Sequence, residues 1–370
     1  MNLRTLARFP LLALAMLSLL AGVLGGLARL AVDVPAPASA QAGVHGALMI
    51  AAFFGTVISL ERAVALGRFW PYLAPALAGL GGLTLLGGLP TIAAQWLFVG
   101  GGLTLLAGSV VVLQRQIVLF TVVLALGAAS WLIGNLVWLA TGLVQAAIPW
   151  WLGFLVLTIA GERLELTRFL PARPAAAPLF VASVVILLAG ALASHWTEGA
   201  GLRVFACGLL ALSAWLLRYD IARHNARQRG LTRFIAICLL AGYVWLAIGA
   251  LLGIVGNFVP DAAMRDAALH AIVLGFVFSM VFGHAPIIFP AVAKVRIPYH
   301  PVFYLPLIVL HASLALRVLG NGSDDFVWRQ QGALANAFAL LLFIVTMVTS
   351  VVRGRRQHPG SRTGPRGDTR

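Results

Sequence analysis

Two histidines stand near the starts of apolar segments that are long enough to cross a membrane. His45 begins the segment 43–66, and His270 lies near the start of the segment 264–292. An ionisable side chain inside a bilayer is costly and is a functional-site hypothesis by default. Neutral imidazole suits iron, and two facing helices can supply both axial ligands of one heme. The pattern predicts that His45 and His270 hold a b-type heme. Interfacial histidines bonded to lipid or backbone are the alternative.

Two further histidines lie within apolar segments. His284 follows His270 by 14 residues, which in a regular α-helix places the two about 40° apart around the axis and about 21 Å apart along it. His311 lies roughly 15 Å into the segment 301–320. Both are predicted as ligands of a second metal or of a high-spin iron. The alternative is a buried histidine bonded to a neighbouring hydroxyl or carbonyl.

Charged and aromatic residues near these segments could assist a cofactor. Arg265, Trp328 and Arg329 fall close to the predicted heme end, where Arg and Trp are donors for anionic propionates. The alternative is interfacial anchoring. Two repeated pairs, Glu61-Arg62 and Glu162-Arg163, indicate either a proton path or ion pairs at the cytoplasmic edge.

Composition places the chain in a membrane. Apolar residues make up 61% of the 370 residues and charged residues only 10%, which is more apolar than a soluble core requires. The net charge of +15 is typical of basic cytoplasmic loops in membrane proteins, so nucleic acid is not predicted as a partner; the lipid bilayer is. Cys207 and Cys238 form no CxxC motif, and both are predicted as core thiols.

We predict an all-α, polytopic membrane protein with twelve transmembrane helices, because a run of about 20 apolar residues spans a bilayer. Residues 1–352 form one transmembrane domain, and residues 353–370 form a basic, disordered cytoplasmic tail. The predicted spans are 10–32, 43–66, 71–90, 92–113, 116–141, 147–167, 177–195, 201–221, 232–258, 264–292, 301–320 and 330–352.

The basic residues predict the orientation, since cytoplasmic loops are enriched in Lys and Arg. With both termini inside, every inward loop is basic, and the outward loops are near neutral or acidic. A multi-pass protein of the bacterial cytoplasmic (inner) membrane is therefore expected. The start of the chain imitates a signal peptide, but its apolar run is too long for one. Of the 26 Lys and Arg residues, the ones that face outward are Arg29, Arg203, Arg265, Arg317 and Arg329.

A short internal repeat suggests three units of four helices. The second span ends in Glu61-Arg62 and then Arg68-Phe69, and the sixth ends in Glu162-Arg163 and then Arg168-Phe169. The tenth span ends in Gly283-His284. We interpret helices two, six and ten as equivalent, in three four-helix arcs.

This arrangement resembles subunit I of the heme-copper oxidases, in which helices two and ten supply the axial ligands of a low-spin heme. The resemblance implies a heme that is bound near the outer surface of the membrane. More closely, three segments resemble the NnrS family of heme- and copper-containing membrane proteins linked to nitric oxide metabolism. They are His270-Ala271-Ile272-Val273-Leu274-Gly275, Gly283-His284 and Leu314-Ala315-Leu316-Arg317-Val318-Leu319-Gly320.

The departures from these families limit the expected chemistry. The oxidases bind copper with histidines on helices six and seven, whereas here helix six has none and helix seven has only His195 at its end. No oxygen-reducing heme-copper centre is therefore expected, and copper is implied only by the NnrS resemblance. The early helix keeps His45-Gly46-Ala47 in place of the fuller His-Ala-His-Glu-Met pattern of that family.

The predicted function is heme binding with nitric oxide metabolism or membrane electron transfer, the partners being nitric oxide or a respiratory electron donor. The sequence identifies no catalytic residue, so whether the protein is an enzyme stays open. Two alternatives remain. One is a secondary transporter, which twelve helices and many glycines also fit. The other is an assembly or scaffold component of a respiratory or denitrification complex.

Overall fold

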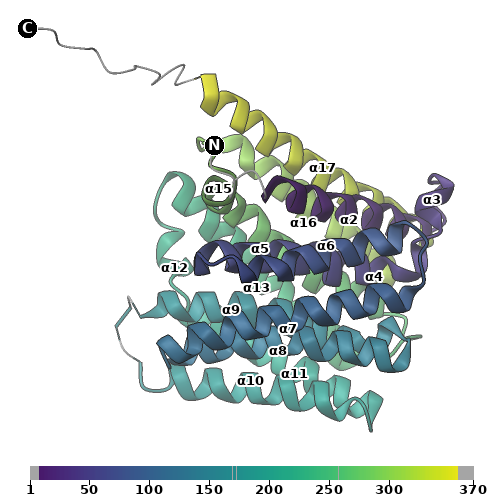
Figure 1. The fold of residues 1–370 in the computed structure, drawn as a ribbon, viewed down its shortest axis with the longest axis horizontal. Helices are drawn as coiled ribbons and strands as arrows, with labels where there is room; N and C mark the ends of the chain where they lie inside the picture. Colours follow the sequence, from purple (N-terminus) through teal and green to yellow (C-terminus); the bar gives the residue numbers. More distant parts are fainter. Residues whose placement is uncertain (1–7, 169, 172, 257, 357–370) are drawn as a thin grey trace, which may run out of the picture.

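The computed structural model describes residues 8–168, 170–171, 173–256 and 258–356, and this part of the chain is helical with no strands (Figure 1). The long helices run side by side in one bundle. Helices adjacent in sequence pack as antiparallel neighbours, as short connections favour. The last helix, α17, packs against the first, α2, and the Gln330 side-chain amide donates to the carbonyl of Leu30, just after α2 ends. The ends of the membrane domain therefore meet.

Eleven helices of the described residues are long and apolar enough to cross a membrane. This confirms a helical membrane protein. Nine of the spans consist wholly or mainly of one α-helix, and these helices are α2 (Arg8–Ala28), α7 (Thr91–Arg115), α8 (Leu119–Thr141), α9 (Val144–Thr167), α10 (Ala176–Ala193), α11 (Glu198–Tyr219), α13 (Gly230–Gly256), α16 (Tyr304–Gly322) and α17 (Phe326–Arg356). The other two spans are composite helices, Ala42–Leu66 and Arg265–Ala293.

The predicted third span is shorter than expected. A 3-10 turn, η3 (Trp70–Tyr72), leads into α6 (Leu73–Leu86), and the Gly87-Gly88-Leu89-Pro90 sequence ends the helix before residue 90. This apolar helix falls below the length of the eleven spans. The count of twelve and the three-arc repeat therefore stay predictions. Short helices α3 (Ala36–Ser39) and α12 (Ala222–Asn225) and the 3-10 turns η1 (Ala42–Val44) and η5 (Pro301–Phe303) complete the fold of the described residues.

Both composite helices change from α to π geometry just after the predicted heme histidine. His45 begins α4 (His45–Ala47), which passes into the π segment η2 (Leu48–Phe54) and then α5 (Gly55–Leu66). His270 ends α14 (Arg265–His270), which passes into the π segment η4 (Ala271–Phe278) and then α15 (Ser279–Ala293). π turns inside α-helices are frequently found at functional sites. The π segment η4 lies between His270 and His284. The predicted rotation of about 40° and separation of about 21 Å between these residues therefore do not apply, because those values assume a regular α-helix.

Two other expectations can be compared with the fold. Cys238 is buried as predicted, but the prediction for Cys207 is wrong, because its side chain is exposed on α11. Helix α17 continues to Arg356, past the predicted boundary at 352, and the rest of the predicted tail lies outside the described residues.

Candidate functional site

A cavity with a volume of about 460 Å³ lies at the end of the bundle where α14 begins. Segments far apart in sequence line it: α2, the start of the second span, α9, α14 with η4, and both C-terminal helices. Its walls include apolar side chains, and its polar groups are two histidines, four arginines and two aspartates in addition to amides. The cavity brings together His45, Arg265, His270 and Arg329 of the predicted site.

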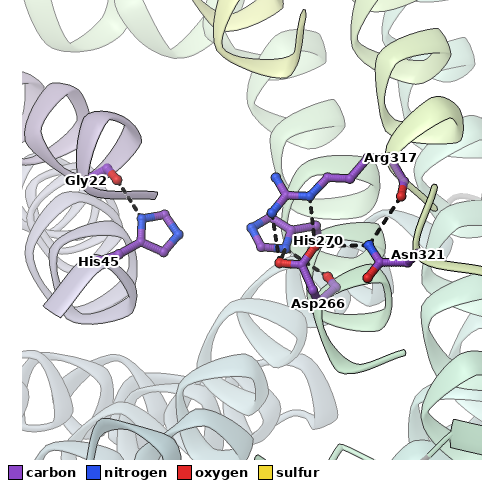
Figure 2. Close-up of polar contacts among 6 residues, drawn as sticks. All are labelled: Gly22, His45, Asp266, His270, Arg317 and Asn321. Atoms are coloured by element: carbon purple, nitrogen blue, oxygen red, sulfur yellow. Dashed lines mark hydrogen bonds and ion pairs between the residues drawn. The ribbon is translucent and has the colours of Figure 1, made fainter. Parts of the chain in front are cut away.

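The imidazole rings of His45 and His270 face each other across this cavity. Their centroids are 6.2 Å apart and their planes differ by 16°. Figure 2 shows the Nε2 atom of each ring pointing into the gap between them. A metal–imidazole bond is about 2 Å long and the ring centre lies about 1 Å behind the nitrogen, so two imidazoles on one metal have centroids about 6 Å apart. The observed separation would suit two imidazoles that bind one metal ion.

Hydrogen bonds fix the tautomer of both rings. His45 Nδ1 is 2.5 Å from the Gly22 carbonyl oxygen, and His270 Nδ1 is 2.8 Å from the Asp266 carbonyl oxygen (Figure 2). A carbonyl can only accept, so each Nδ1 carries the proton and each Nε2 keeps its lone pair. Metal-bound histidines almost always donate their other ring N–H in this way. The two rings are therefore prepared to coordinate through Nε2.

A polar network supports the His270 side of the cavity. The Asp266 carboxylate accepts two hydrogen bonds from Arg317, from Nε at 2.9 Å and from the second terminal nitrogen at 2.8 Å. Asn321 Nδ2 donates to the same carboxylate at 3.2 Å. One Asp266 oxygen also lies 3.2 Å from His270 Nδ1. No role was predicted for Asp266 or Asn321 from the sequence, since nothing in their spacing predicts a contact across two helices.

Four of the five arginines predicted to face outward line this one cavity: Arg29, Arg265, Arg317 and Arg329. Arg317 is paired with Asp266, and Arg265 donates to the Phe258 carbonyl. Arg329 Nε is buried without a hydrogen-bond partner. The cavity has two more arginines than aspartates, Asp261 and Asp266 being the acids. Arginine favours planar carboxylates, so the cavity has the charge to hold a ligand with two carboxylates.

Close packing of the last two helices brings two of these arginines to the cavity. A Cβ on Gly320 would lie 2.5 Å from the Arg329 backbone nitrogen, and a Cβ on Gly332 would lie 2.6 Å from the Arg317 backbone nitrogen. Only glycine allows such an approach of two backbones. α16 and α17 therefore lie close together at the level of Arg317 and Arg329.

These features fit a heme. The opposed Nε2 atoms suit the iron, the arginines suit the two propionates, and side chains such as Ile50, Leu152 and Leu274 supply apolar walls. Trp328 is not among the described residues that line the cavity. Its side chain is 46% exposed, and its backbone N–H donates to the Asp325 carboxylate.

One family model, described as a domain of unknown function (DUF8744), matches residues 8–352. The chain belongs to this family. No curated protein and no solved structure matches it. This family is described as a domain of unknown function, so the geometry of the cavity has to indicate the function.

His284 and His311 do not line the cavity of this DUF8744 protein. The His284 Nδ1–H donates to the Met280 carbonyl at 2.8 Å, so its Nε2 also keeps a lone pair. His311 differs, because its Nδ1 accepts a hydrogen bond from Trp245 Nε1 at 2.9 Å. The proton of a neutral His311 is then on Nε2, which suits metal binding poorly. No cluster of three or more His, Cys, Asp or Glu side chains that could hold a metal occurs within the described ranges.

Three residues of the repeated Glu-Arg pairs, namely Arg62, Glu162 and Arg163, form ion pairs across helices. Arg62 of α5 pairs with Glu162 of α9, and both side chains are partly exposed. Arg163 and Asp220 form a buried pair with two hydrogen bonds of 2.8 and 3.0 Å. This favours the structural alternative for Arg62, Glu162 and Arg163.

Proposed function

We propose that this protein is a membrane hemoprotein that holds a b-type heme between His45 and His270 and takes part in electron transfer. The observation that supports the proposal is the pair of near-parallel imidazoles 6.2 Å apart, each with its Nδ1–H bonded to a carbonyl. Arg29, Arg265 and Arg329 would bind the propionates. Copper and a second metal at His284 or His311 have no comparable support in the described residues.

When bound, heme supplies a reversible one-electron couple. The protein would contribute two histidine ligands in fixed positions, arginines that bind the anionic propionates, and apolar side chains that line the cavity. Because His45 and His270 would both bind the iron, a heme held here would favour electron transfer over the binding of a gas. Because of the resemblance to the NnrS family, we also propose a role in nitric oxide metabolism. His45 or His270 would have to leave the iron for nitric oxide to bind there.

The proposal is tested by the visible spectrum of the full-length protein purified in detergent after expression with heme precursors. We expect a Soret band with a low-spin spectrum and a pyridine hemochrome of the b type. His45→Ala and His270→Ala should each lose the low-spin spectrum, and the double variant should lose the heme. His284→Ala, on the same composite helix as His270, is the matched control and should keep the wild-type spectrum.

Two outcomes would contradict the proposal. One is folded protein that binds no heme when heme is supplied. The other is a spectrum that is unchanged in the double variant. Heme-free protein that is stabilised by a solute would favour the secondary transporter instead.

A further inference from the structure

The two histidines of the cavity are supported unequally. His45 Nδ1 meets only a neutral backbone carbonyl, that of Gly22. His270 Nδ1 meets the Asp266 carbonyl at 2.8 Å and an oxygen of the Asp266 carboxylate at 3.2 Å. A carboxylate behind a ligating histidine raises the basicity of that ligand. His270 is therefore the stronger electron donor of the pair.

Arg317 opposes this effect. It binds the Asp266 carboxylate through two nitrogens, and its side chain is only 8% exposed. The Asp266 side chain is 33% exposed, so water partly screens the pair, and the guanidinium charge offsets part of the carboxylate charge. Asn321, which is also buried, donates to the same carboxylate and holds its orientation (Figure 2).

We propose that Asp266 and Arg317 are positioning residues that set the reduction potential of the heme through His270, in opposite directions. Asp266 favours the ferric state by adding negative charge behind the ligand. Arg317 favours the ferrous state by withdrawing that charge. This inference rests on the proposed function, because it requires His270 to be a ligand.

The test is a spectroelectrochemical titration of the purified holoprotein. Asp266→Asn keeps the shape of the side chain and removes its charge, so the midpoint potential should rise. Arg317→Gln leaves the carboxylate uncompensated, so the potential should fall. Asp261→Asn is the matched control, because Asp261 lines the same cavity without a described contact to either imidazole. It should shift the potential less than Asp266→Asn.

A purely structural role would lower heme content without moving the potential of the heme that remains. Equal potentials in wild type, Asp266→Asn and Arg317→Gln with intact low-spin spectra would overturn the inference, as would an equal shift in Asp261→Asn. If Arg317→Gln does not fold, Asn321→Ala replaces it and should also lower the potential. If the wild-type protein holds no heme, the proposed function itself is contradicted. That outcome is distinct from an unchanged potential in a protein that does hold heme, which contradicts only this inference.

Discussion

The phenyl rings of Phe53 and Phe278 lie parallel, with centroids 6.0 Å apart and 7° between their planes. Phe54 packs against the edge of the same Phe278 ring. Phe53 and Phe54 end the π segment η2, and Phe278 ends the π segment η4. The two segments that follow the cavity histidines are therefore joined by an aromatic cluster, which fixes the spacing of the helices that present the imidazoles.

Phe278→Ala should destabilise the protein by about 3–5 kcal/mol, because a buried aromatic side chain is lost and a cavity remains. It should also weaken heme retention, since the two π segments would no longer be held together. Thermal unfolding and heme content measure both effects. Phe338→Ala removes the same side chain at a position that is 56% exposed and should change stability by less than about 0.5 kcal/mol. Equal losses in both variants would argue against the role of the cluster.

The near-parallel rings of His45 and His270 predict the electron paramagnetic resonance spectrum of the ferric protein. Parallel imidazole planes give a rhombic low-spin signal, whereas perpendicular planes give a strongly anisotropic one. With 16° between the planes, we expect the rhombic signal from frozen holoprotein. A strongly anisotropic signal would show that the imidazole rings rotate when heme binds.

Gly26→Ala should disturb the site without changing any polar group. The added Cβ would lie 2.8 Å from Cε1 and 2.9 Å from Nδ1 of His45, so the ring would have to move and its bond to Gly22 would be strained. Loss of such a supporting interaction lowers metal affinity by about 10-fold or more. Gly43→Ala is the control, because Gly43 also lines the cavity and its Cβ would meet nothing within 4 Å. Titration of the heme-free protein with heme compares the two, and similar affinities would contradict the prediction.

The two ion pairs at the ends of α5, α9 and α11 should differ in their effect on stability. Asp220→Ala leaves the buried Arg163 without its partner and should cost about 3–5 kcal/mol. Glu162→Ala breaks the pair with Arg62, which is partly exposed, and should cost at most about 1 kcal/mol. Chemical denaturation in detergent measures both. A larger cost for Glu162→Ala would show that the Arg62 pair is the structural one.

The predicted orientation can be tested by cysteine labelling in intact cells. Starting from a Cys207→Ser, Cys238→Ala chain, we expect Asp324→Cys to react with a membrane-impermeant maleimide. Asp324 adjoins the cavity end, between α16 and α17. Lys294→Cys, just after α15 ends, should react only after the membrane is disrupted. The reverse pattern would place the cavity on the cytoplasmic side.

Apolar length predicted the membrane helices well, because each span is a property of one continuous segment. The pairing of His45 with His270 was also predicted, and the two rings do face each other. The polar network behind His270 was not predicted, because Asp266, Arg317 and Asn321 come together only when α14 and α16 pack against each other. The departure of four arginines from the positive-inside pattern was visible in the sequence and could have pointed to their shared cavity. The π segments produce no recognisable signal in the hydrophobic periodicity of the sequence. The relative directions of the side chains along those two helices could therefore not be predicted.

The contact of α16 with α17 has a consequence for mutational tolerance. Gly320 and Gly332 carry no charge and touch no histidine, yet the positions of Arg317 and Arg329 depend on how closely these glycines let the backbones approach. Even a change to alanine at either position would separate two guanidinium groups and thereby alter the electrostatic potential of the cavity. These two glycines are therefore constrained by the charge of the site as much as by packing.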